Sequence, residues 1–119
     1  MSSEKRVRWF EDILANIARI ERFTAGMDLA KLGEEEQIFF AVLHALLIIS
    51  ESARRLGTEA EKLAPGPPWR AIRDLGNVLR HAYDGVDPAV ICRIVRDDLG
   101  SLRQAVERAL QNPPMGENP

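Results

Sequence analysis

The chain has 119 residues, of which 45% are hydrophobic and 29% are charged, and its formal net charge at pH 7 is −2. This length favours one domain with one hydrophobic core, and the composition is typical of a globular protein rather than of a disordered or membrane-embedded chain. The slightly negative charge argues against a protein that coats nucleic acid by bulk electrostatic attraction.

Apolar residues in the first half of the chain recur with helical spacing. They predict a first helix over residues 4–23, in which one apolar stripe returns at intervals of three and four. A second helix is predicted over residues 34–56, and because it is apolar on nearly all sides we expect it to be the most buried. A short helical turn at residues 58–64 and the breaker "PGPP" follow it.

Two further helices are predicted in the second half. A third helix over residues 69–83 opens after "PGPP", because proline in a first turn loses no helical hydrogen bond. The fourth helix runs from Pro88, with Asp87 as its N-cap, to Leu110, and we expect Gly100 to bend it.

These elements predict an all-α fold, a single four-helix up-and-down bundle with a short extra helical turn between its second and third helices. The domain is expected to span residues 1–111, and the polar, proline-rich residues 112–119 are expected to form a disordered tail. The N-terminus has no apolar leader pattern, and the most apolar run, "IFFAVLHALLII", is too short to span a bilayer. We therefore expect a cytoplasmic protein that makes no use of a membrane.

The predicted third helix has a basic side and an apolar side. At about 100° per residue, three arginines, an amide and an imidazole share one side, opposite the residues expected to face the core. Guanidinium groups donate forked hydrogen bonds to phosphate oxygens, and histidine transfers protons near neutral pH, although an ordinary solvated helix face has the same pattern. The basic side comprises Arg70, Arg73, Asn77, Arg80 and His81; the apolar side comprises Ala71, Ile72, Leu75, Val78, Leu79 and Ala82.

A polar seam crosses the otherwise apolar second helix. Gln37, His44 and Glu51 recur every seven residues, which aligns them along one side of the helix. For His44 we favour a structural role over a catalytic one: a buried histidine hydrogen-bonded to a neighbouring acid, or a residue that lines a dimer interface.

Residues 8–110 resemble the HepT-like branch of the HEPN superfamily. The resemblance is carried by the order and lengths of the four helices and by two stretches, "AVLHALLIISESARRLG" and "WRAIRDLGNVLRHAYDGVDPAVICRIVRDDLGSLR". It implies a HEPN-like four-helix toxin that dimerises, cleaves RNA without a metal, and is paired with a small nucleotidyltransferase antitoxin.

The resemblance also assigns roles to single residues. The family motif is an arginine, four to six further residues, a histidine, and a tyrosine two positions beyond. His81 matches the catalytic histidine, Asn77 the polar residue after the motif arginine, and Tyr83 the tyrosine to which the antitoxin can attach AMP. Glu51 matches a glutamate common in the family, and its expected use is to pair with an arginine of the third or fourth helix.

The motif arginine itself is absent. The three positions at which it could stand are Asp74, Leu75 and Gly76; Arg73 lies one residue too early, and Arg80 directly precedes the histidine. Arg73 is on the same helix face as Asn77 and His81 and is the expected replacement, with Arg70 and Arg80 binding RNA phosphate.

Two functions therefore stay open. One is a metal-independent endoribonuclease toxin that acts as a homodimer with His81 from both subunits in one composite site. The other is a catalytically inactive binding module that keeps the nucleotidyltransferase partner and is modified by it. No cofactor or metal site is expected, because two distant histidines and one cysteine give no zinc-ligand spacing and no glycine-rich phosphate loop is present.

Overall fold

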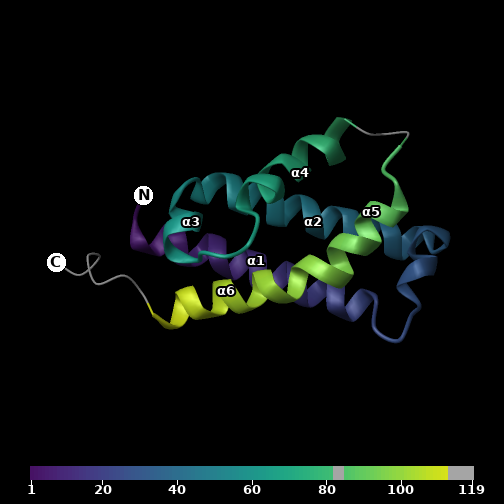
Figure 1. Cartoon of the computed structure of the whole chain (residues 1–119), viewed down its shortest axis with the longest axis horizontal. Helices are drawn as coiled ribbons and strands as arrows, with labels where there is room; N and C mark the ends of the chain where they lie inside the picture. The colour runs from purple at the N-terminus through teal and green to yellow at the C-terminus, as the bar shows by residue number, and fades with distance from the viewer. Residues whose placement is uncertain (82–84, 113–119) are drawn as a thin grey trace.

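The computed structural model describes residues 1–81 and 85–112, and His81 is described by its backbone alone. The regular structure of this part is entirely helical, as expected from the sequence (Figure 1). Tyr83 lies outside the described residues, as does the expected tail apart from Asn112. In chain order the elements are α1 (Ser3–Phe23), the 3-10 helix η1 (Leu29–Glu34), α2 (Glu36–Leu56), α3 (Glu59–Leu63), α4 (Trp69–His81), α5 (Pro88–Arg93), the π-helical η2 (Ile94–Asp98) and α6 (Leu99–Gln111).

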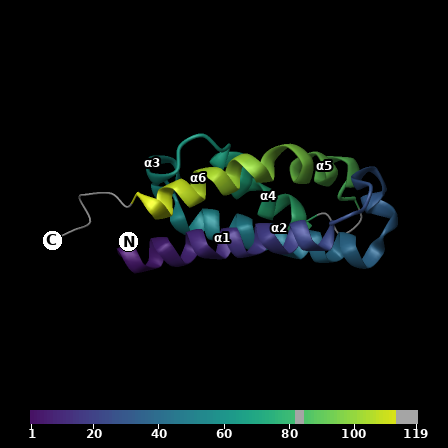
Figure 2. The same ribbon diagram turned by 90° about the horizontal axis from the view of Figure 1, so that it is seen from below.

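The two long helices α1 and α2 lie side by side along the length of the molecule (Figures 1 and 2). α4 packs against α2, and α6 packs against α1. Trp69, at the start of α4, is 1% exposed; its indole N–H donates to the Ala64 carbonyl at 2.7 Å, and its ring meets Phe10 edge-on. This tryptophan ties the beginning of α4 to the core formed by α1 and α2.

α2 is the most apolar helix, as the sequence predicts. By length and composition it could cross a bilayer, since an 18-residue window has a mean hydropathy of 1.4. Its buried face packs against its neighbours through residues such as Val42, Leu46 and Ile49, and 39% of this window is buried. One side of α2 nevertheless stays uncovered, and Phe40 there is 60% exposed.

The segment before α2 differs from the prediction. The sequence placed the second helix from Glu34, but residues Leu29–Glu34 form η1 and α2 begins at Glu36. The Asp28 side chain caps η1 by accepting from the Ala30 N–H at 3.0 Å. A Cβ at Gly33 would lie 2.7 Å from the Pro88 ring, so this glycine allows η1 to approach the start of α5 closely.

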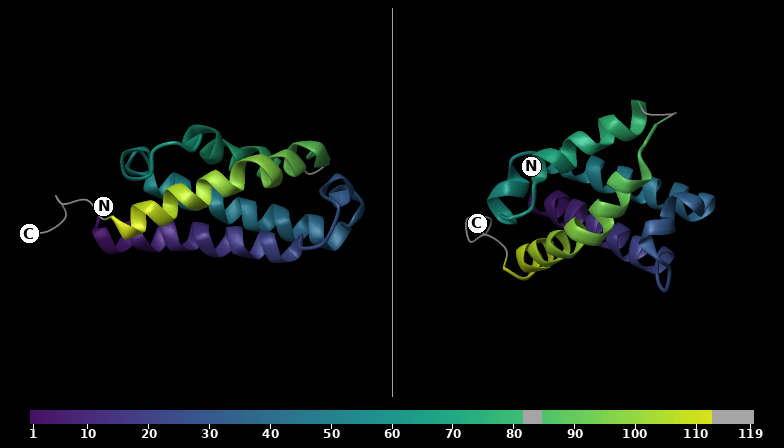
Figure 3. Two further views of the ribbon diagram at one scale, coloured as in Figure 1. Left: turned by 60° about the horizontal axis from the view of Figure 1, so that its bottom comes forward. Right: turned by 45° about the vertical axis from the view of Figure 1, so that its right-hand side comes forward.

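The fourth predicted helix is interrupted, although Gly100 is not the cause. The irregularity is the π-helical segment Ile94–Asp98, while Gly100 lies inside α6 with open space where a Cβ would stand. Figure 3 shows α5 and α6 continuing from one another through this segment.

The predicted core face of α4 is wrong in part. Ala71 is exposed and Val78 is 55% exposed, whereas Gly76 is buried. α4 meets α2 along the line of Gly76 rather than along the centre of its apolar side. Four apolar residues of α4 line an open groove of about 490 Å³ between α4 and α5, together with Val90 and Ile94: Ala71, Ile72, Leu75 and Val78. Ala82, also predicted on this face, lies outside the described residues.

One buried hydroxyl joins α2 to α4. The Gly76 N–H donates to Ser50 Oγ at 2.8 Å, and the Ser50 hydroxyl donates to the Arg73 carbonyl at 3.1 Å. Ser50 is 0% exposed, and a Cβ at Gly76 would lie 2.7 Å from its oxygen. Close approach of the two helices therefore requires a glycine at position 76 and a small hydroxyl residue at position 50.

We expect Gly76→Ala to destabilise the protein, although alanine is the better helix former by about 1 kcal/mol. The added methyl group must displace Ser50 Oγ or separate the helices, at a cost of about 1–3 kcal/mol. The matched control is Gly100→Ala, which meets nothing within 4 Å and should leave stability unchanged or raise it. Urea unfolding measures both variants, and equal stabilisation by the two alanines would contradict the close contact.

Candidate active site on α4

The basic side of α4 is divided between two ion pairs. Arg70, Asn77 and Arg80 are exposed residues, and Arg73 is half-buried. The α4 backbone reaches His81, which directly follows Arg80. Asn77 is four residues before His81, so their Cα atoms are about one helical turn apart on the same side of α4.

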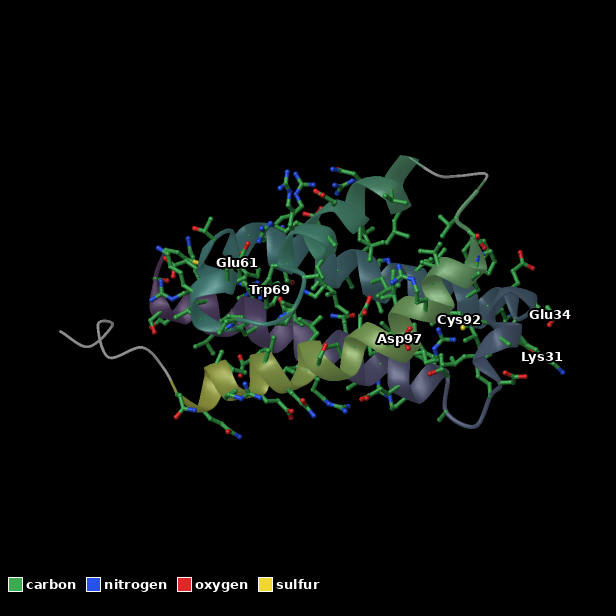
Figure 4. All side chains as sticks on the ribbon, viewed as in Figure 1. Lys31, Glu34, Glu61, Trp69, Cys92 and Asp97 are labelled. Atoms are coloured by element: carbon green, nitrogen blue, oxygen red, sulfur yellow. The ribbon has the colours of Figure 1, made fainter. Side chains whose placement is uncertain are left out.

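Arg73 is held by α3. Its guanidinium makes two hydrogen bonds to the Glu61 carboxylate, at 2.8 and 2.7 Å, and a third to the Gly57 carbonyl at 3.3 Å. The hydrogen bond from Arg73 lowers the pKa of Glu61, and the same bond raises the pKa of Arg73. Figure 4 labels Glu61 on α3, beside the start of α4 at Trp69. Arg73 thus fastens α3 to α4.

Arg80 is held by α2 and by its own helix. One guanidinium nitrogen donates to the Glu51 carboxylate, and the other donates to Asn77 Oδ1 at 3.1 Å. Arg54 also lies 3.7 Å from Glu51. The hydrogen bond from Arg80 lowers the pKa of Glu51, with smaller contributions from the charges of Arg80, Arg54 and Arg55. Glu51 therefore stays ionised at pH values below those at which a glutamate usually takes up its proton. It pairs with an arginine of α4, the kind of partner expected from the sequence.

The guanidinium of Arg80 lies in the space beside Gly76. A Cβ at Gly76 would be 3.6 Å from Arg80 Nη2. Gly76 is the position directly before Asn77, where the resemblance puts the motif arginine. The chain thus lacks a side chain at that position, where Ser50 Oγ packs against the backbone, and the guanidinium from one helical turn later lies close by.

The expected burial of His44 is wrong. Both His44 and Gln37 are exposed, because the seam lies on the uncovered side of α2 near Phe40, and only Glu51 is half-buried. The other expectation for His44, that it lines a dimer interface, stays a prediction. Among the side chains that the structure describes, in residues 1–80 and 85–112, no group of three or more histidine, cysteine or carboxylate side chains is placed to hold a metal ion.

Several partners in this site could not be found from the sequence. Glu61 and Ser50 are separated from the residues they hold, Arg73 and Gly76, by 12 and 26 positions. The sequence around these two residues does not indicate their roles. Glu61 resembles an ordinary solvated acid, and Ser50 resembles a small residue in an apolar helix. The long-range packing of α2, α3 and α4 alone brings them to the site.

The chain matches known proteins over most of its length. The family described as Ribonuclease HepT-like matches residues 13–109. A protein of Thermococcus cleftensis named "Probable ribonuclease HepT" is 34% identical over 84% of this chain and 91% of its own length. A candidate RNase of Methanocaldococcus jannaschii, MJ1380, is 30% identical over 90% of this chain and 98% of its own length.

No solved structure matches the chain. The family match covers α2, α4 and α5 completely, and it therefore includes Glu51, Gly76, Arg80 and His81. The protein belongs to the HepT-like ribonuclease family of the HEPN superfamily.

Proposed function

We propose that this protein is the toxin of a toxin–antitoxin pair, a metal-independent endoribonuclease that works in the cytoplasm as a homodimer of HEPN-like four-helix bundles. The observation that carries the proposal is the guanidinium of Arg80 beside Gly76, directly before His81 and held by Glu51 and Asn77. Membership of a ribonuclease family supports RNA as the substrate.

These residues supply the groups that RNA cleavage by internal attack requires. The 2′-hydroxyl loses its proton to a base and bonds to the phosphorus, and the 5′-oxygen leaves with a proton from an acid. His81 of each subunit can fill one of these two roles in a composite site across a twofold axis. Arg80 stabilises the negative charge that develops on the phosphorane oxygens, and Asn77 orients its guanidinium.

The contacts favour Arg80 over Arg73 as the replacement for the absent arginine. Arg73 binds both oxygens of Glu61 and also a backbone carbonyl, so phosphate could recruit it only by breaking three hydrogen bonds. Arg80 gives one nitrogen to Glu51 and the other to a neutral amide, and its side chain is 38% exposed. Arg70, also exposed, is a phosphate contact in the same proposal.

A catalytically inactive binding module is the second candidate. It is favoured by the lack of an arginine at position 76 and by the ion pairs of Arg73 and Arg80, which are also what purely structural residues would make. Such a protein would keep the nucleotidyltransferase partner and serve as its substrate.

Single substitutions separate these candidates on protein purified without its partner and unmodified at Tyr83. His81→Ala should lower cleavage of single-stranded RNA by about a hundredfold or more, because it removes the proton-transfer group. Arg80→Ala should lower the cleavage rate about a hundredfold, the loss expected when an oxyanion-hole donor is removed. Arg73→Ala should cleave at nearly the wild-type rate. Chelator should change nothing. Loss of activity in Arg73→Ala with none in Arg80→Ala would overturn the assignment, and wild-type protein that cuts no RNA would establish the binding module.

The uncovered side of α2 predicts the dimer interface. Phe40 is 60% exposed, and Leu47 and Ile48 on the same side of the helix are half-buried, so a second copy would cover an apolar surface next to Arg80. Light scattering at about tens of micromolar should show a dimer for wild type and a monomer for Phe40→Asp. Val90→Asp, on the groove side of the molecule, is the matched control and should stay dimeric. A wild-type monomer would remove the composite site.

Tyr83 is proposed as the residue that the partner modifies. After incubation with the nucleotidyltransferase and ATP, mass spectrometry should show one added AMP on wild type and none on Tyr83→Phe. Label that persists in Tyr83→Phe, or wild type that stays unmodified, would exclude this tyrosine as the acceptor.

A further inference from the structure

A half-buried tryptophan lies between cationic side chains at the N-terminal end of α1. The Arg55 guanidinium carbon, from the end of α2, is 4.7 Å from the Trp9 ring centroid, and that of Arg8 is 5.3 Å away. Arg8 and Arg55 are both exposed. In this arrangement a large aromatic ring is partly open to solvent, and two phosphate-binding groups lie over it, so a base that stacks on the ring displaces one of them.

This cluster adjoins the residues of α2 that contact the α4 site. Arg55 follows Arg54, which lies 3.7 Å from Glu51, and Glu51 accepts the hydrogen bond from Arg80. The charges of Arg80, Arg54 and Arg55 all lower the pKa of Glu51. Arg80 and Arg54 thus lie beside one carboxylate, Arg55 follows on α2, and basic side chains extend from α4 over the end of α2 to Trp9 on α1.

The strip crosses three neighbouring helices, from Arg80 near the end of α4 to the first turns of α1. α4 packs against α2 and α2 against α1, with helix axes about 8–10 Å apart at each contact. Both panels of Figure 3 show the N-terminus of α1 at the same end as α3 and the beginning of α4. A single strand bound at Arg80 can therefore reach Trp9 by crossing one intervening helix.

The chemistry of the strip fits single-stranded nucleic acid better than an acidic protein surface. Guanidinium groups track a phosphate backbone, and an aromatic ring adds base stacking, which every base can make regardless of sequence. An acidic peptide would use the arginines and leave the ring without a matching partner.

We propose that the Arg80–Arg54–Arg55–Trp9–Arg8 strip binds the single-stranded RNA substrate outside the cleavage site, with a base stacked at Trp9. This inference rests on the proposed ribonuclease function and adds the path of the substrate.

The two tryptophans make the stacking directly measurable. Trp69 is 1% exposed, so quenching of tryptophan fluorescence by a bound base reports on Trp9. The probe is a 2′-O-methylated oligonucleotide, which lacks the attacking hydroxyl and stays intact. An oligonucleotide of about twelve nucleotides should quench the emission and bind about tenfold more tightly than one of about three nucleotides, which cannot cover the strip.

Three variants distinguish binding at the strip from non-specific attraction of RNA to positive charge. Trp9→Leu keeps an apolar side chain at that position and should weaken binding of the long oligonucleotide about tenfold, the fold-change expected for one lost stacking contact. Arg55→Ala should also weaken it. Arg22→Ala, which removes the same charge from the other end of α1, should bind as wild type does. Circular dichroism and the emission of Trp69 check that each variant is folded.

The outcomes separate the strip from the nuclease. Length-dependent binding and quenching with no cleavage would support the strip and contradict the proposed activity. Cleavage that depends on Arg80, with no quenching and wild-type affinity in Trp9→Leu, would overturn the strip and keep the activity. Equal losses in Arg55→Ala and Arg22→Ala would overturn it as well, because they would indicate non-specific attraction alone.

Discussion

The hydroxyl of Ser50 sets the distance between α2 and α4, and the arrangement of the candidate site depends on that distance. It accepts a hydrogen bond from the Gly76 amide and donates one to the Arg73 carbonyl, with no solvent access. A buried donor and acceptor left without these partners would cost about 1–3 kcal/mol each. The contact therefore selects one register of α4 on α2. A purely apolar interface of similar size would define this register less sharply.

The register determines which arginine faces which acid. With Gly76 fixed against Ser50, the preceding turn of α4 brings Arg73 to Glu61 on α3, and the following turn brings Arg80 to Glu51 on α2. The surface that would bind phosphate is then organised by carboxylates before any ligand arrives. Because these pairs are partly exposed, their effect is on side-chain position more than on the free energy of unfolding.

The same contact bears on the absent motif arginine. A side chain at position 76 cannot be added without displacing Ser50. The close contact of Gly76 with Ser50 therefore leaves no room for an arginine at this position. In this protein a guanidinium nevertheless lies beside Gly76, and it comes from Arg80. Under the proposed function, Arg80 supplies the positive charge that the motif arginine would otherwise give.

Helical periodicity was sufficient to predict α1 and most of α2, and the breaker "PGPP" was sufficient to predict the start of α4. It failed where packing between helices decides the outcome. The predicted core face of α4 included Val78 because periodicity depends on where apolar side chains recur. Gly76 has no side chain, so the pattern does not indicate that the helices approach most closely there. His44 was expected inside because α2 is apolar, yet α1 and α4 leave that side of the helix uncovered. The basic residues of α4 were recognised correctly as a group, but their partners on α2 and α3 lie far away in sequence.

A double-mutant cycle between Glu51→Gln and Arg80→Ala tests the central claim, that Glu51 positions Arg80 to act in place of the absent arginine. The measured quantity is kcat/KM for a single-stranded RNA, with unmodified dimer. Each single variant should be slower than wild type, and Glu51→Gln should cost nothing further once Arg80 is gone, because the carboxylate acts through that guanidinium. Losses that multiply in the double variant, or an Arg80→Ala enzyme that cuts at the wild-type rate, would contradict the claim.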